Sequence, residues 1–362
     1  MKFSVSKNNL VGALGRVSGV VSNRTLPILA NVLLQAKDNT LSVTGTDLEL
    51  ELSSSCQADV VDAGVITVPA RKLLDISRAL PDGDIKMSLD EAKLTLAIGP
   101  CRYVLSTLPG KEYPSVDVGS VTCGFSVDSS TLLDLFARTS FAMANSDVRH
   151  YLNGALLEIT SGQLRVVATD GHRLAVCDHP AGVDGEGLAV ILPRKAVSEI
   201  TRLFGDGVVS VSIGESFVRL EGAEITLVSK LIDGKFPDYN RVLPKGLSNT
   251  LVGDRQALMA AFSRAGILSH EQHRGIKLQP GADSLAIETS NPESECATDQ
   301  ISISFSGESF EIGFNVNYLT DALRSLTGSS VQILMGDAGS SVLISDPDSN
   351  TRHDIVVMPM RV

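Results

Sequence analysis

The strongest constraint on this chain is that its sequence repeats three times, weakly but in the same order. One block starts at Phe3 as FSVSKNNLVGALGRVSGVV, and it returns at Phe125 as FSVDSSTLLDLFARTSFAM and at Leu251 as LVGDRQALMAAFSRAGIL. Two other blocks recur in register with it, with copies that start at Val68, Leu192 and Phe314 and at Asn31, Gly154 and Gly275. A period of about 120 residues therefore predicts three copies of one structural unit.

The expected boundaries lie where GSVTCG and PKGLSNT interrupt the repeated pattern. They divide the chain into repeats at residues 1–121, 122–245 and 246–362. Because 43% of the 362 residues are apolar, each repeat has enough material for a core of its own. No long linker separates the repeats, so we expect them to pack in a rigid row.

Each repeat is expected to contain a helix, strands, a second helix and further strands. The first helix of the second repeat follows Asp128 and carries Leu132, Phe136 and Met143 on one stripe. The second helices follow a proline and carry apolar stripes at Leu73, Ile76 and Leu80 in the first repeat and at Val197, Ile200 and Phe204 in the second.

Alternating β-branched runs such as LSVTGTDLELEL and LRVVATDGHRLAV predict the strands. Turn-forming pairs, Asp38-Asn39 and Ser161-Gly162, separate these strands. The predicted fold class is therefore α+β, with two helices packed on the sheet of each repeat.

Composition limits the possible partners and the compartment. A formal net charge of −11 argues against simple electrostatic adhesion to nucleic acid or to an acidic membrane, so any DNA contact must be local. The five cysteines form no CxxC pair, which favours a reduced cytoplasm; they are Cys56, Cys101, Cys123, Cys177 and Cys296. No apolar run approaches the ~18 residues of a membrane helix, and MKFSVSKNN lacks the apolar region of a signal peptide. We therefore expect a soluble cytoplasmic protein.

Six arginines recur at two equivalent helix positions. Aligning the first helices brings together Arg16, Arg138 and Arg264, and aligning the second brings together Arg78, Arg202 and Arg324. Each lies two residues from a core position, about 200° around the helix, so it is expected to point away from its sheet. A single such arginine is typically a solvated surface residue. Recurrence in all three repeats of an acidic protein instead favours one shared surface that binds phosphates without reading bases.

A row of three repeats can also close on itself. If two chains join head to tail, twelve helices spaced roughly 10 Å apart give a circumference of roughly 120 Å and a hole about 25–30 Å wide. Such a hole would admit duplex DNA. The periodicity permits this closure but does not require it.

Asp170 and His172 in ATDGHRL suggest an enzymatic alternative, a hydrolase that uses this pair on a repeat scaffold. The equivalent positions of the other repeats hold Asp47 and Asn291, which favours instead an Asx turn that closes a strand. An HxxH pair, His270 and His273, has no further ligand at motif spacing, so zinc is not expected. The sequence has no phosphate-binding loop, nucleophile elbow or dinucleotide fingerprint.

Seven strings spread along the chain carry a resemblance to a known family. They are TLPIL (25–29), GTDLEL (45–50), VPARK (68–72), VRHYLNG (148–154), ATDGHRLAVC (168–177), SKLIDGKFPDYNRVLPK (229–245) and VVMPMR (356–361). Together they closely resemble the bacterial DNA polymerase III β subunits, the β sliding clamps. The resemblance implies three tandem clamp repeats per chain and a head-to-tail homodimeric ring, with helices inside and sheets outside. It further implies a protein without catalytic activity or cofactor that encircles duplex DNA and tethers polymerases, which confers processivity in replication.

The resemblance also implies a pocket between the second and third repeats and the C-terminal tail, where polymerases and the clamp loader insert a short linear motif. The residues it assigns to this pocket are Leu152, Thr169, Gly171, His172, Arg173, Leu174, Pro237, Arg241, Val242, Asn315, Tyr318, Ser341, Val356, Met358, Pro359, Met360 and Arg361. The residues themselves give partial support, because the methionines of VVMPM adapt to varied apolar ligands. A C-terminal strand held in the sheet of the third repeat is the alternative, and both can hold together.

Two further sets of residues follow from the resemblance. Four positions outside the helices face DNA in the family, and here they are Arg24, Arg149, His150 and Tyr151. Family members often carry an aromatic pair in this loop, so His150 departs from the pattern, whereas phosphate contacts depend only on charge. The edges of repeats 1 and 3 meet between subunits, and the residues expected there are Arg102, Tyr103, Ile267, Leu268, Glu293 and Glu295.

Overall fold

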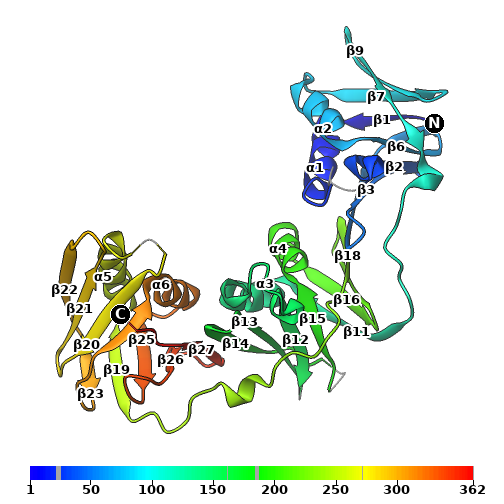
Figure 1. The fold of residues 1–362 in the computed structure, drawn as a ribbon. Helices are drawn as coiled ribbons and strands as arrows, with labels where there is room; N and C mark the ends of the chain where they lie inside the picture. Colours follow the sequence, from blue (N-terminus) through cyan, green and yellow to red (C-terminus); the bar gives the residue numbers. More distant parts are fainter. Residues whose placement is uncertain (22–25, 161, 184–186, 271, 362) are drawn as a thin grey trace. The chain divides into compact units, whose positions relative to one another are not determined.

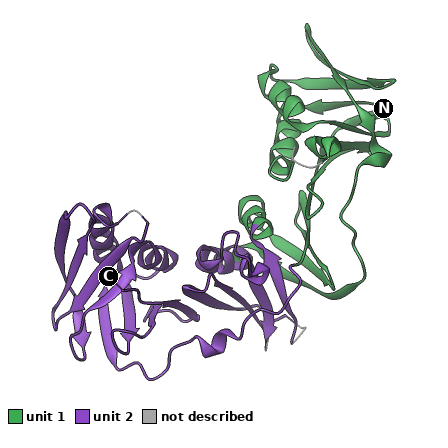
Figure 2. Ribbon diagram, in the orientation of Figure 1, with its two compact units in different colours: residues 1–130, 195–231 green, residues 131–194, 232–362 purple. Residues whose placement is uncertain are grey.

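The computed structural model describes residues 1–21, 26–160, 162–183, 187–270 and 272–361. They form two compact units, one of residues 1–130 and 195–231 and one of residues 131–194 and 232–362 (Figure 2). Within the described ranges, no helix is long and apolar enough to cross a membrane.

Each repeat consists of two successive segments, and each segment has the order strand, helix, three strands (Figure 1). The first repeat contains β1 (Lys2–Ser6), α1 (Lys7–Val17), β2 (Asn31–Lys37), β3 (Thr40–Thr46), β4 (Leu50–Gln57), β6 (Gly64–Pro69), α2 (Ala70–Ala79), β7 (Asp84–Asp90), β8 (Lys93–Ile98) and β9 (Cys101–Ser106). The second contains β11 (Val121–Asp128), α3 (Ser129–Thr139), β12 (Gly154–Thr160), β13 (Gln163–Thr169), β14 (Arg173–Pro180), β15 (Ala189–Pro193), α4 (Arg194–Leu203), β16 (Val208–Gly214), β17 (Phe217–Glu221) and β18 (Ile225–Lys230). The third contains β19 (Asn249–Asp254), α5 (Arg255–Ile267), β20 (Gly275–Pro280), β21 (Ser284–Ser290), β22 (Cys296–Ser302), β24 (Ile312–Asn315), α6 (Val316–Ser325), β25 (Ser330–Met335), β26 (Val342–Ser345) and β27 (His353–Val357).

Short elements fill the connections between these segments. The additional strands are β5 (Asp59–Asp62), β10 (Leu108–Pro109) and β23 (Ser304–Ser306). The 3₁₀ turns are η1 (Pro27–Ala30), η2 (Gly110–Glu112), η3 (Ser140–Ala142), η4 (His150–Leu152) and η5 (Tyr239–Arg241).

Side-chain caps fix where several helices begin. Ser6 accepts a hydrogen bond from the Asn9 amide at 3.2 Å at the start of α1, and Asp254 accepts one from the Ala257 amide at 2.7 Å at the start of α5. Such caps satisfy amides that the first helical turn leaves unpaired. The apolar stripe of α1 is buried against β3 and β4, and α1 also packs against α2.

Most local predictions agree with these elements. Helices α2 and α4 follow Pro69 and Pro193, and Asp38 and Asn39 adopt positive φ in the turn between β2 and β3. The prediction for Met143 is wrong in one respect: α3 ends at Thr139, so Met143 is buried beyond the helix and not on its stripe. Ser161 lies outside the described residues.

The first unit contains a nine-stranded sheet that joins two repeats. Its order is β10-β6-β2-β3-β4-β18-β17-β16-β11, so β4 of repeat 1 pairs with β18 of repeat 2. Leu52 and Leu227 face each other at this junction, and both are fully buried. A second sheet of five strands has the order β5-β1-β7-β8-β9.

The second unit has the corresponding arrangement. Its nine-stranded sheet has the order β15-β12-β13-β14-β27-β26-β25-β19-β23, so β14 of repeat 2 pairs with β27 of repeat 3. A four-stranded sheet has the order β22-β21-β20-β24.

The structure thus adds a feature to the predicted fold, because each repeat contributes its strands to two sheets. The sheets cross the repeat junctions, and this is why the boundary between the two compact units runs through repeat 2. Two strands, β9 and β22, lie at sheet edges in the positions that β18, β27, β4 and β14 occupy at the junctions.

Candidate functional site

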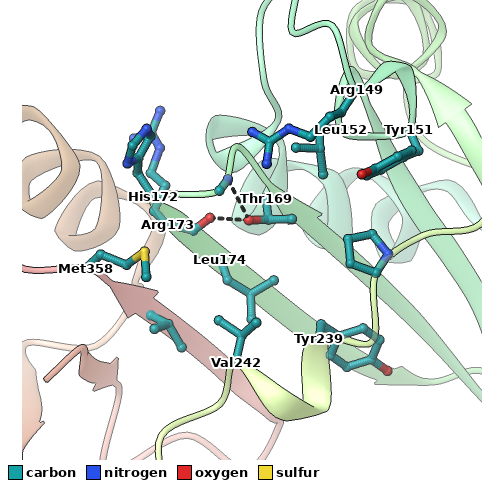
Figure 3. Close-up of a pocket in the computed structure, with 13 residues that line it drawn as sticks. Arg149, Tyr151, Leu152, Thr169, His172, Arg173, Leu174, Tyr239, Val242 and Met358 are labelled. Atoms are coloured by element: carbon teal, nitrogen blue, oxygen red, sulfur yellow. Dashed lines mark hydrogen bonds between the residues drawn. The ribbon is translucent and has the colours of Figure 1, made fainter.

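A pocket with a volume of about 250 Å³ lies in the second unit (Figure 3). Apolar side chains make up most of its surface. Its lining residues are Arg149, Tyr151, Leu152, Thr169, Gly171, His172, Arg173, Leu174, Pro237, Tyr239, Val242, Val356 and Met358. This volume is slightly below that of typical ligand pockets, which measure roughly 300–1,000 Å³.

The turn between β13 and β14 shapes one wall of the pocket. Thr169 Oγ1 donates to the carbonyl of Arg173 at 2.6 Å and accepts from the Gly171 amide at 3.1 Å (Figure 3). Gly171 has a φ of +90°, and a Cβ there would lie 3.0 Å from the Arg149 guanidinium. Glycine is therefore favoured, mainly because other residues would be strained in this backbone conformation.

The base of the pocket is formed where β14 pairs with β27. Leu174 faces Val356 in this pairing, and each is only 1% exposed. The chain then continues as a tail whose Met358 amide donates to the His172 carbonyl at 2.9 Å. This bond holds the half-exposed Met358 side chain beside the pocket. Both sequence alternatives for the C-terminus therefore hold, a strand paired in the sheet and a tail at the pocket wall.

Tyr239 is a lining residue that the sequence analysis did not find. Its hydroxyl donates to Glu158 at 2.7 Å and accepts from Arg165 at 3.1 Å, and Arg165 is also bonded to Asp178 at 2.6 Å. Burial, together with the bond to Glu158, raises the pKa of Tyr239. A signal was present, because the first repeat also ends with a hydrogen-bonded tyrosine, Tyr113, in KEYP.

Arg173 connects the pocket to α6. Its guanidinium is paired with Asp170 at 3.0 Å and with Asp321 at 2.7 Å, and its side chain is only 12% exposed. It also lies 4.6 Å from the ring centroid of Tyr318 and 5.3 Å from that of Phe141. These contacts hold the pocket wall in one arrangement, because an arginine between two rings and two carboxylates has little freedom left.

The structure brings ten of the predicted pocket residues together around this cavity. They are Leu152, Thr169, Gly171, His172, Arg173, Leu174, Pro237, Val242, Val356 and Met358. The others do not line it, and they are Arg241, Asn315, Tyr318, Ser341, Pro359, Met360 and Arg361.

Several of the residues outside the cavity have contacts that explain their positions. Tyr318 lies behind the wall and stacks on His172, with 6.3 Å between ring centroids. Arg241 is exposed and paired with Asp238 at 3.0 Å. Asn315 caps α6, and the Met360 amide donates to the Gly313 carbonyl at 2.9 Å. Binding of a partner peptide by either group stays a prediction.

The six predicted helix arginines share one structural position, the last turn of their helix. They are Arg16, Arg78, Arg138, Arg202, Arg264 and Arg324. Arginine is favourable there because the helix dipole places partial negative charge at the C-terminus. Five of the six pair with carboxylates. The pairs are Arg16 with Glu224, Arg138 with Asp134, Arg202 with Glu199, Arg264 with Asp299, and Arg324 with Asp321.

Arg138 differs from the other arginines. Its side chain is only 14% exposed and pairs with Asp134 at 2.8 Å. Its backbone carbonyl bonds to the buried His353 of β27 at 2.9 Å, which places the end of α3 against the sheet. A contact between Arg138 and DNA stays a prediction, as it does for the other five arginines.

The loop residues predicted to face DNA lie beside the pocket. Arg149 and Tyr151 line it, and His150 is exposed between them. Arg149 pairs with Asp147 at 2.9 Å, and this hydrogen-bonded pair lowers the pKa of Asp147 to about 2. Arg24 lies outside the described residues.

The predicted subunit-contact residues lie on the two sheet edges or near them. Tyr103 and the neighbouring Val104 on β9 are 40% and 52% exposed, and Ile267 at the end of α5 is 76% exposed. Arg102, Glu293 and Glu295 are also exposed, and Leu268 is half-buried.

The Asx turns predicted at equivalent points of the three repeats are confirmed in the first two repeats. Oδ1 of Asp170 accepts from the amides of His172 and Arg173 at 2.9 and 3.0 Å. Asp47 accepts from the amides of Glu49 and Leu50 in the same way, whereas Asn291 accepts from the amide of Glu295, four residues further on. With its second oxygen on the Arg173 guanidinium, Asp170 serves the turn, and no observation supports the hydrolase alternative. Among the described residues, no cluster of three or more His, Cys, Asp or Glu side chains could hold a metal ion.

Comparison with known proteins identifies the family. Three family models match in sequence order: the N-terminal, central and C-terminal domains of the DNA polymerase III beta subunit, at residues 1–117, 126–238 and 240–361. The chain belongs to the DNA polymerase III β subunits, the β sliding clamps.

Individual relatives agree with this over the full length of the chain. The Beta sliding clamp of Pseudomonas putida is 49% identical, and all of both chains is covered. The crystal structure of the DNA polymerase III subunit beta from Pseudomonas aeruginosa is 46% identical with a TM-score of 0.97, again covering all of both chains. Another structure from that organism, with a TM-score of 0.96, is of a DnaN sliding clamp bound to griselimycin. The three tandem clamp domains and the function in replication that the sequence predicted are therefore confirmed.

Proposed function

We propose that two copies of this chain close head to tail into a ring around duplex DNA and tether polymerases to it, without any catalytic activity of their own. The observation that carries this proposal is that β9 and β22, the strands equivalent to those that join consecutive repeats, have no partner on one side in the described chain. Consecutive repeats join through β4–β18 and β14–β27. The equivalent strands left over are β22 and β9, so a β22–β9 pairing between subunits would extend the same rule.

The number of strands in each sheet agrees with this closure. The two sheets that cross repeat junctions each have nine strands, and the sheets that end in β9 and β22 have five and four. Joining the edges of two chains would therefore make a third nine-stranded sheet of the same kind. Exposed edge strands are otherwise a liability, because their unpaired backbone groups bind other chains. A heterologous contact of this kind forms a closed ring when the rotation between subunits closes after two copies.

The helix arginines supply the proposed contact with DNA. Arg78, Arg264 and Arg324 have exposed guanidinium groups, and the carboxylates beside Arg264 and Arg324 leave them part of their hydrogen-bonding capacity. Such partly neutralised cations bind phosphate weakly, which suits a ring that must slide along the duplex. The acidic remainder of the chain, with a net charge of −11, prevents adhesion elsewhere.

The pocket is the proposed docking site for polymerases and the clamp loader. Its apolar base and its flexible Met358 suit a short linear motif with apolar side chains. The relative from Pseudomonas aeruginosa is bound to griselimycin, and we infer that this chain can bind griselimycin as well.

These activities place the protein in the cytoplasm, on the DNA of the nucleoid during replication. We keep the domain boundaries at residues 121 and 245. The supporting observation is that the chain between η2 and β11, and between η5 and β19, carries no regular structure.

Retention on circular DNA tests the ring. The protein, once placed on a nicked circular plasmid by a clamp loader, should remain bound through gel filtration and should leave when the plasmid is cut once. Equal loss from circular and linear DNA would mean that the protein does not encircle the duplex.

Removal of the tail tests the pocket separately. A chain that ends before Met358 should remain dimeric but bind a polymerase-derived peptide at least about tenfold more weakly, because buried anchors cost about 2 kcal/mol each. Unchanged peptide affinity would place the docking site elsewhere.

A further inference from the structure

Asp321 on α6 has arginine partners from two different surfaces. Its Oδ2 accepts from Nη1 of Arg173 at 2.7 Å, and its Oδ1 lies 3.4 Å from Nη1 of Arg324. Arg173 lines the pocket, whereas Arg324 lies in the last turn of α6 among the arginines proposed to face DNA. One carboxylate therefore connects the docking pocket with the DNA-facing surface.

The spacing along α6 produces this connection. Tyr318, Asp321 and Arg324 follow one another at three-residue intervals, which places them on one side of the helix. The Tyr318 ring lies 4.6 Å from the Arg173 guanidinium at the pocket end of this row. Arg324 is at the other end, with 63% of its side chain exposed.

The two ion pairs of Asp321 differ in strength. The pair with Arg173 is short, and the side chains are 12% and 30% exposed. The pair with Arg324 is longer and more exposed, so water and salt screen it more strongly. Asp321 is thus held mainly by Arg173, and its contact with Arg324 can be lost at little cost.

We propose that Asp321 couples occupancy of the docking pocket to phosphate binding at Arg324, so that each event favours the other. This inference rests on the proposed function, since it uses the pocket and the DNA-facing surface assigned there. An apolar ligand in the pocket removes water from Arg173, which strengthens its attraction to Asp321. The carboxylate then leaves Arg324, and the full charge of Arg324 becomes available to a phosphate.

The reverse direction follows from the same competition. A phosphate that binds Arg324 replaces Asp321 there, and the carboxylate pairs more fully with Arg173. The pocket wall is then already held in the arrangement that a ligand requires. Because coupling between two sites is reciprocal, DNA must tighten peptide binding by the same factor by which the peptide tightens DNA binding. We expect a factor of about two to five, the size that an exposed ion pair can supply.

The test measures two affinities, each with and without the other ligand. The probes are a short fluorescent duplex at low ionic strength and a labelled peptide copied from the segment with which a DNA polymerase binds its clamp. In the unaltered protein, each ligand should raise the affinity for the other ligand about two- to fivefold. In Asp321→Asn the factor should fall to one, and Asp321→Glu should restore part of it. Arg324→Ala should also abolish the coupling. Because Asp321 then pairs only with Arg173, this variant should bind the peptide in the absence of DNA as tightly as the unaltered protein binds it in the presence of DNA.

Glu224→Gln is the matched control. It frees a helix arginine, Arg16, from its carboxylate in the other compact unit, so it changes duplex affinity but should leave the coupling factor unchanged. Independent binding of peptide and duplex to the unaltered protein would overturn the inference and leave the proposed function intact. A coupling factor that persists in Asp321→Asn would overturn the role of Asp321. Failure of either ligand to bind would overturn both the inference and the proposed function.

Discussion

The junctions between consecutive repeats and the sheet edges at β9 and β22 use equivalent strands in opposite states. At the junctions, most residues of β18, β27 and β14 are buried, and β4 buries the alternate residues Leu50, Leu52 and Ser54. At the free edges, β9 exposes most of its side chains, and β22 alternates between exposed and half-buried residues. The same strand position can therefore be part of a core or of a surface, and the pairing partner alone makes the difference.

A buried charge should give the largest difference in unfolding free energy between a junction strand and an edge strand. Leu227→Asp would bury an unpaired carboxylate opposite Leu52 in the β4–β18 junction, which should cost about 4 kcal/mol or more of unfolding free energy. The same kind of change on the edge strand β9, Val104→Asp, should cost under about 0.5 kcal/mol in a single chain, because Val104 is 52% exposed. Urea unfolding of the two variants under monomeric conditions checks this contrast. Equal losses would show that the edge is already as buried as the junction.

Disrupting the free edges should change assembly and leave the fold intact. Ile267→Ala combined with Leu268→Lys should weaken the dimer by about a hundredfold or more, since two anchors at about 2 kcal/mol each are lost. Sedimentation should then detect a folded monomer. Val61→Lys on β5 is the control, because it alters an exposed apolar residue of another edge strand and should leave the dimer unchanged.

The junction register also predicts which residues meet between subunits. Positions on the edge strands can be matched to positions on the junction strands through the register of the hairpins that contain them. Val104 of β9 then corresponds to Val228 of β18, and Cys296 of β22 corresponds to Glu51 of β4. Because Val228 faces Glu51, Val104 should face Cys296 of the second subunit.

Val104→Cys should therefore form a disulfide with the exposed Cys296 on mild oxidation, visible as a covalent dimer on a non-reducing gel. Arg102→Cys is out of register and should not. Cross-linking by the second variant alone would mean that the strands are shifted by two residues.

Acid should weaken one junction through His353. This residue of the β14–β27 junction is buried, with Nε2 on the Arg138 carbonyl, and burial lowers its pKa to about 4 from 6.5. Between pH 6.5 and about pH 4, His353 binds a proton in the unfolded chain but not in the folded chain. The contribution of neutral His353 to the free energy of unfolding is therefore fully present above pH 6.5 and is lost as the pH falls towards 4. At 1.36 kcal/mol per unit the loss is about 3 kcal/mol. Unfolding of the native chain and of His353→Gln across this range checks the effect, and the variant should lack this part of the pH dependence.

The ion pair at the β4–β18 junction should contribute least. Arg16 and Glu224 are partly exposed, so Glu224→Gln should change the unfolding free energy by less than about 1 kcal/mol. Leu52→Ala in the same strand pair should cost about 2–5 kcal/mol, because it removes a fully buried side chain. A larger loss of unfolding free energy in Glu224→Gln than in Leu52→Ala would mean that the ion pair, and not apolar packing, stabilises the junction.

Much of the candidate site was predictable from the sequence, but for different reasons at different residues. The family strings carried the β13–β14 turn and Met358, and the repeat alignment alone identified Asp170 as an Asx-turn residue. Tyr239 was missed because its role depends on Glu158 and Arg165, which are distant in sequence and meet it only after the sheet has formed. The contact between the end of α3 and His353 could not be predicted either, because helical periodicity describes one helix against its own sheet and does not include β27.

By itself, the sequence determined the number of repeats, the order of helices and strands, and the position of one arginine at the end of each helix, since these depend on local patterns and on comparison of the copies. Only the tertiary structure decided that strands of adjacent repeats share sheets, that β9 and β22 remain as edges, and that Asp321 lies between two arginines. Strand pairing across a junction joins residues that are far apart in sequence, as Leu52 and Leu227 are. No local pattern records such a pairing, because backbone hydrogen bonds form equally well between many strands, and packing against the rest of the fold selects one.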